Sequence, residues 1–91
     1  MKTRAKDEAK KRLARMEGQV RGILNMIEDD RECVDVLTQV AALRAALEGL
    51  GSLVLTQHVE EVISSVGTSV DSEALSDRVE SVREALSRFV K

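Results

Sequence analysis

Proline, tryptophan and tyrosine are absent from this 91-residue chain, and Phe89 is its only aromatic residue. Without proline, no position is barred from a helix interior by a missing backbone N–H group. Alanine, leucine, valine, glutamate and arginine dominate instead, and most of these residues are strong helix formers. The composition therefore predicts an all-α protein.

Cysteine and histidine each occur once, as Cys33 and His58. A single cysteine cannot form an internal disulfide, which favours a reducing compartment over secretion. No apolar stretch has membrane-spanning length, and the first dozen residues are charged rather than signal-like. We therefore expect a cytoplasmic protein without a membrane partner.

Charge is distributed unevenly along the chain. The formal net charge is only -2. Residues 1–22 nevertheless carry eight cations against three anions, whereas the rest of the chain carries six cations against thirteen anions. This asymmetry is typical of a nucleic-acid-binding face on an otherwise acidic body.

One domain over residues 1–91 is expected to hold three helices, at about 4–28, 33–64 and 72–89. The outer two each carry an apolar stripe with three-four spacing, which in the first helix comprises Leu13, Met16, Val20, Ile23 and Ile27. Opposite that stripe lies a basic face. Ser64, Ser65 and the small residues at 67–69 predict the end of the second helix, and Asp71 or Ser72 can cap the third.

The middle segment is apolar nearly all round, so two amphipathic helices cannot cover it. The surplus surface predicts an antiparallel dimer along this helix. If the helix is continuous, Cys33 and His58 are separated by roughly 37 Å at 1.5 Å per residue, and their side chains can meet only across two chains. Gly49 and Gly51 leave a second possibility open, a hairpin that brings both side chains together within one chain.

No phosphate loop, Cys-x-x-Cys pair or Ser-His-Asp order is present in the sequence, so we do not expect an enzyme, and no cofactor is required. A thiolate and an imidazole do suit Cu(I) or Zn(II). The residue pattern thus leaves a metal site at Cys33 and His58 as one possible chemistry.

The run from Arg12 to Ile23, together with Cys33 and the segment 37–47 (LTQVAALRAAL), resembles the CsoR/RcnR family of bacterial transcriptional repressors. The resemblance implies a three-helix protomer, an antiparallel homodimer and a homotetramer built from two dimers. It also implies operator DNA as partner, released when an effector occupies an inter-subunit site. The DNA-binding residues expected on this basis are Lys11, Arg12, Arg15, Gln19, Arg21 and Arg44, although Arg21 and Arg44 could order the tetramer through salt bridges.

The sensing residues depart from the family's copper pattern. Copper-responsive members carry a cysteine or histidine four residues after the histidine, where this chain has Val62, and the histidine set of nickel or cobalt sensors is absent. The Glu32-Cys33 pair more closely resembles the formaldehyde-responsive FrmR branch. The expected function is therefore a repressor released by formaldehyde or another electrophile at Cys33, with His58 nearby.

Two alternatives remain open at this point. One is a metal-responsive repressor that binds Cu(I) or Zn(II) through Cys33 and His58, with Glu61 or water as a supplementary ligand. The other is a structural helical oligomer without DNA binding.

Overall fold

The computed structural model describes residues 1–66 and 72–89 and confirms the all-α, three-helix fold. Helix α1 spans Thr3–Glu28, α2 spans Cys33–Val66 and α3 spans Ser72–Phe89. Helix α2 ends two residues later than expected, because Ser64 and Ser65 continue it and the Ser65 hydroxyl donates to the Val62 carbonyl at 2.9 Å. The loop expected at 67–69 and the cap expected at Asp71 lie outside the described residues.

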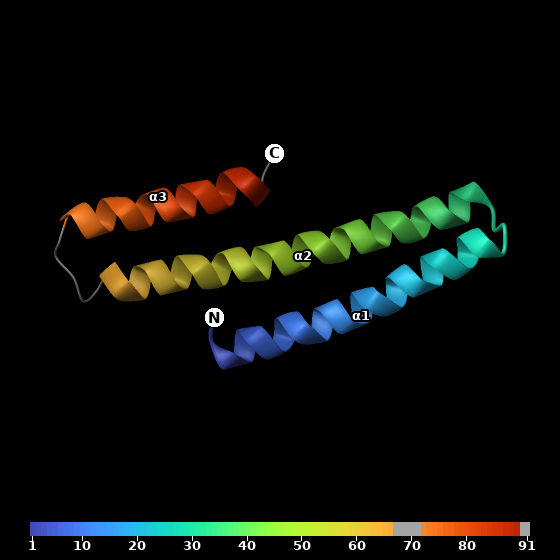
Figure 1. Ribbon diagram of the computed structural model, residues 1–91, viewed down its shortest axis with the longest axis horizontal. Coiled ribbons are helices and arrows are strands. Elements are labelled where there is room, and N and C mark those ends of the chain that lie inside the picture. Colours follow the sequence, from blue (N-terminus) through green and yellow to red (C-terminus); the bar gives the residue numbers. More distant parts are fainter. Residues whose placement is uncertain (67–71, 90–91) are drawn as a thin grey trace.

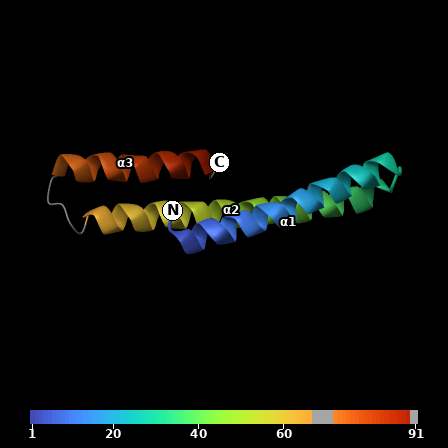
Figure 2. The same ribbon diagram turned by 60° about the horizontal axis from the view of Figure 1, so that its bottom comes forward.

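The three helices lie side by side in nearly one layer, with extents of 60 × 28 × 13 Å (Figures 1 and 2). Helix α1 runs antiparallel to α2 on one side, and α3 runs antiparallel to the carboxyl-terminal half of α2 on the other (Figure 1). The amino-terminal half of α2 therefore has a neighbour on one side only.

A tight turn joins α1 to α2. The Arg31 amide donates to the Met26 carbonyl at 3.0 Å, and the Asp30 amide donates to the Ile27 carbonyl at 3.2 Å. This paired pattern closes a helix with a left-handed residue, and Asp30 has a φ of 54°. The Glu32 carbonyl then accepts the first bond of α2, from Val36 at 3.1 Å, which places Glu32 at the N-cap and Cys33 in the first turn.

Helix α2 passes through Gly49 and Gly51 without interruption, so the hairpin alternative is wrong. Side chains of the neighbouring helices occupy the space that these glycines leave. A Cβ atom at Gly51 would lie 2.9 Å from Phe89 Cδ1 and closer still to two other ring carbons. The one aromatic ring of the chain therefore rests on the α2 backbone at Gly51.

The chain buries little by itself. Among the described residues, the buried hydrophobic side chains are Ala5, Ala9 and Met16, all on α1. On the amino-terminal half of α2, by contrast, Val34 is 71% exposed and Leu37 is 65% exposed. A single layer cannot enclose a core, which is consistent with the surplus apolar surface expected from the sequence. The oligomer itself remains a prediction.

Candidate functional site

Cys33 lies exposed at the first position of α2, beside the turn. Its surroundings are acidic, since Glu32 precedes it and Asp35 lies in the same helical turn. Arg31 lies 3.6 Å from the Asp35 carboxylate. The thiol is therefore accessible to a metal ion, a small molecule or a second chain.

His58 lies near the other end of α2 and is held by α3. Its Nε2 atom lies 2.9 Å from Ser81 Oγ, within hydrogen-bonding distance. When Nε2–H donates to Ser81, Nδ1 keeps its lone pair for a ligand; in the other tautomer Ser81 donates and Nδ1 carries the proton. Ser81 is thus a residue that the sequence reasoning missed, because nothing in the helical pattern marks one serine of α3 as the partner of an α2 histidine.

A cavity of about 310 Å³ lies between α2 and α3 at His58 and is also lined by Glu61, Val62, Asp77 and Arg78. Val62 offers no donor atom at this cavity. Glu61 does, but its Oε1 atom is paired with the Met1 amine at 2.7 Å. The hydrogen bond and charge of that amine lower the pKa of Glu61, and the nearby His58 contributes in the same direction.

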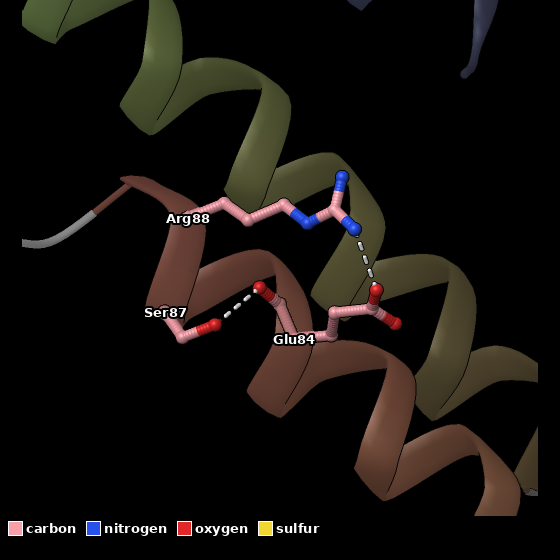
Figure 3. Close-up of polar contacts among 3 residues, drawn as sticks. All are labelled: Glu84, Ser87 and Arg88. Atoms are coloured by element: carbon pink, nitrogen blue, oxygen red, sulfur yellow. Dashed lines mark hydrogen bonds and ion pairs between the residues drawn. The ribbon is translucent and has the colours of Figure 1, made fainter.

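A larger cavity of about 630 Å³ follows along the same helix pair towards the end of α3. Its lining includes an ion pair between Arg88 Nη2 and Glu84 Oε1 at 2.8 Å, while Ser87 Oγ donates to the Glu84 backbone carbonyl at 2.9 Å (Figure 3). Most of its lining is apolar and comes from α2, including Leu50, Val54 and Leu55. Both residues of this ion pair belong to α3 and line the cavity, so their opposite charges are paired at its α3 side.

One chain does not bring Cys33 and His58 together. They sit 25 residues apart on one continuous helix, which corresponds to roughly 37 Å. Within residues 1–66 and 72–89, no group of three His, Cys, Asp or Glu side chains could hold a metal ion. A site that uses both residues consequently needs a second chain.

Three of the six predicted DNA-binding residues share one groove between α1 and α2. Arg12, Arg15 and Gln19 line it, over a floor of small α2 residues that includes Ala45 and Gly49. Arg12 Nε donates to Glu8 Oε1 at 3.2 Å. Lys11 is exposed on the adjoining surface of α1 and lines a neighbouring depression with Arg4 and Glu8.

Arg21 and Arg44 lie elsewhere. Arg21 lines the groove on the other side of the α1–α2 contact, which is mostly apolar and includes Leu13, Val20, Leu24, Leu43 and Leu47. Arg44 is exposed on α2, where its Nε lies 3.5 Å from Glu48 Oε1. The layer thus has a basic groove on one face and an apolar groove on the other, and Arg21 belongs to the apolar face.

Comparisons with known proteins agree with this architecture. The family model described as "Metal-sensitive transcriptional repressor" matches residues 5–91. The copper-sensing transcriptional repressor CsoR of Bacillus subtilis is 42% identical over 71 residues, which cover 78% of this chain and 70% of that protein.

Two solved structures are also similar. The nickel-responsive transcriptional regulator InrS superposes with a TM-score of 0.82 at 34% identity, covering 92% of this chain and 91% of the other. The copper-sensing repressor CsoR with Cu(I) from Geobacillus thermodenitrificans superposes with a TM-score of 0.84 at 30% identity, covering 100% and 92%. The expected CsoR/RcnR resemblance and the expectation of a non-enzyme are both confirmed. The chain belongs to the family of metal-sensitive transcriptional repressors.

Proposed function

We propose that this chain is a DNA-binding repressor that releases its operator when a metal ion binds between subunits. The ligands are Cys33 of one protomer and His58 of the partner subunit. The observation that carries this proposal is the placement of one exposed thiol and one α3-held imidazole at opposite ends of the continuous helix α2. In an antiparallel pair of α2 helices, Cys33 of each protomer would lie beside His58 of the partner subunit. A dimer would therefore contain two such sites.

The donor chemistry favours Cu(I). Thiolate and imidazole are ligands that Cu(I) accepts, whereas a structural Zn(II) site normally takes four protein ligands. Val62 supplies no third donor, and Glu61 is engaged by the Met1 amine. We therefore propose a two-donor site, completed by water or by Glu61 after that ion pair opens.

The comparisons do not support the expectation of formaldehyde sensing. CsoR and InrS are named for copper and nickel, and the matching family is described as metal-sensitive. Metal response is therefore the better-supported alternative, and an electrophile at Cys33 becomes an outcome to be tested. The structural oligomer without DNA binding is set aside for the same reason.

We assign DNA binding to the face that carries Lys11, Arg12, Arg15 and Gln19. Side chains of this type neutralise backbone phosphates, so the affinity should fall steeply with salt. The opposite apolar groove, with Arg21, suits subunit contact, in a homodimer and in a homotetramer of two dimers. Arg44 lies in the exposed amino-terminal half of α2 and belongs with that contact in this proposal.

The test is operator release measured by fluorescence anisotropy, with a labelled duplex from the region upstream of the chain's own gene. Cu(I) should release the DNA at lower concentration than Zn(II), Ni(II) or formaldehyde. The variants Cys33→Ala and His58→Ala should each stay bound. A Cys33→Ala protein that still responds to Cu(I) would exclude this site, and release by formaldehyde alone would restore the electrophile.

Mixing the two inactive variants tests the sharing of the site between subunits. A hybrid dimer of Cys33→Ala and His58→Ala chains contains one intact pair and one doubly damaged pair. The mixture should regain Cu(I) binding that neither variant shows alone. If both variants remain silent after mixing and exchange, the two residues do not form one site across subunits.

A further inference from the structure

Gly49 of α2 lies opposite Arg12 of α1, and the arginine side chain occupies the space that the glycine leaves. A Cβ atom at Gly49 would lie 3.3 Å from Arg12 Nη1. Glycine is unfavourable in a helix interior, because it exposes the backbone and adds disorder to the unfolded chain. At this position, however, a Cβ atom alone already makes the guanidinium shift by a few tenths of an ångström, and a longer side chain would displace it further.

Arg12 is also held from its own helix. Its Nε atom donates to Glu8 Oε1 at 3.2 Å, one helical turn earlier. The Arg12 side chain is 39% exposed, so the guanidinium lies half-sunk in the groove rather than extended into solvent. Two contacts, Glu8 on α1 and Gly49 on α2, thus define where this charge lies.

Arg15 and Gln19 line the same groove, which has a volume of about 270 Å³. A phosphodiester is the ligand that such a set suits, because guanidinium groups donate paired hydrogen bonds to phosphate oxygens. A long side chain loses rotamer freedom when it binds, and an arginine that is already seated loses less. Holding the Arg12 side chain in place before DNA binds therefore favours its contact with a backbone phosphate.

We propose that Gly49 and Glu8 are positioning residues that seat Arg12 for a DNA phosphate. This inference rests on the proposed function, since it presumes that the groove meets DNA. It places one DNA contact of α1 under the control of α2, the helix that carries both Cys33 and His58. A displacement of α2 against α1 would move Gly49, and the Arg12 guanidinium that packs against it would move as well.

The central variant is Gly49→Leu, whose side chain would occupy the space that the Arg12 guanidinium takes beside Gly49. Its affinity for the upstream duplex should fall about tenfold, the effect of losing one charge-assisted hydrogen bond. The slope of log affinity against log salt concentration should also become shallower, by about 0.9 for each phosphate that the variant no longer neutralises. Helix content by circular dichroism should not decrease, because leucine favours a helix more than glycine does.

A double-mutant cycle distinguishes a loss of DNA affinity caused by displacing Arg12 from a loss caused by a general change in helix packing. In an Arg12→Ala background, Gly49→Leu should change the DNA affinity no further. Wild-type affinity in Gly49→Leu, or an equal loss with and without Arg12, would overturn the inference. If Gly49→Leu does not fold, Gly49→Met, whose unbranched side chain also extends beyond Cβ towards Arg12, replaces it, and the same cycle with Arg12→Ala decides.

Glu8 is tested against its exposed neighbour Asp7. Glu8→Gln and Asp7→Asn remove the same charge from adjacent positions, but only Glu8 contacts Arg12. Glu8→Gln should therefore bind DNA more weakly than Asp7→Asn, and equal affinities would remove Glu8 from the seat. Failure of the wild-type chain to bind the duplex even at low salt would refute the proposed function itself, and this inference with it.

Discussion

Replacing Gly51 with alanine is predicted to loosen α3 from α2. The added methyl group would lie 2.9 Å from Phe89 Cδ1 and closer to two further ring carbons, which is a separation that real atoms do not hold. The phenyl ring is rigid, unlike the flexible end of a lysine side chain. It must therefore move away from the α2 backbone as a whole. Because Phe89 is the last residue of α3, the displacement is able to begin at the helix end.

The cost follows from the surface that the ring buries. Phe89 is 41% exposed. About 120 Å² of a side chain of roughly 200 Å² is therefore buried, and its complete exposure costs at most about 3 kcal/mol. Alanine recovers about 1 kcal/mol through its higher helix propensity. We expect Gly51→Ala to lower the free energy of unfolding by up to ~2 kcal/mol.

Urea denaturation monitored by circular dichroism, at matched protein concentrations, gives the measurement. The decisive control is the same substitution in a Phe89→Ala background. There the clash is absent and only helix propensity remains, so Gly51→Ala should stabilise the chain. A stabilising effect in the wild-type background would refute the packing of Phe89 against Gly51.

Three other residues give separate predictions. Asp30→Gly should raise the free energy of unfolding by about 1 kcal/mol in urea denaturation, because a left-handed φ of 54° penalises any side chain. Ser81→Ala should weaken Cu(I) binding about 10- to 100-fold in a competition titration, whereas Ser81→Thr, which keeps the hydroxyl that orients His58, should retain it. The lowered pKa of Glu61 means that its ion pair with the Met1 amine stabilises the fold above the ordinary carboxylate pKa and is lost as pH falls through the lowered value. Carboxyl NMR resonances recorded against pH should show Glu61 titrating below its ordinary range, and an ordinary midpoint would contradict the ion pair.

The helices themselves were predictable because apolar spacing and the absence of proline act locally. The packing of α3 was not. Its apolar stripe leaves Leu75, Val79 and Leu86 between 43% and 47% exposed, while Ser81 and Ala85 line the cavities against α2. Periodicity shows which side of a helix avoids water in the assembled protein. It does not show whether the same chain or another one covers that side.

The candidate site was predictable in its composition but not in its contacts. Cys33 and His58 are conspicuous as the only residues of their kinds. The hydrogen bond between His58 and Ser81 joins residues 23 positions apart, and no sequence pattern distinguishes Ser81 from the other serines of α3. The two glycines of α2 marked special positions, yet only the packed structure shows that Gly51 receives Phe89 and that Gly49 receives Arg12.

The thinness of the layer has a consequence for how much of this protein a cell keeps folded. Only three hydrophobic side chains are buried among the described residues, so in the proposed oligomer most of the stabilising burial would come from another copy. Folding and assembly then form one equilibrium, and the unfolding midpoint should rise with protein concentration. Chains that stay unassembled at low concentration are unfolded and open to proteases. We therefore expect the DNA occupancy of such a repressor to depend steeply on its concentration, because below a certain copy number little folded protein survives.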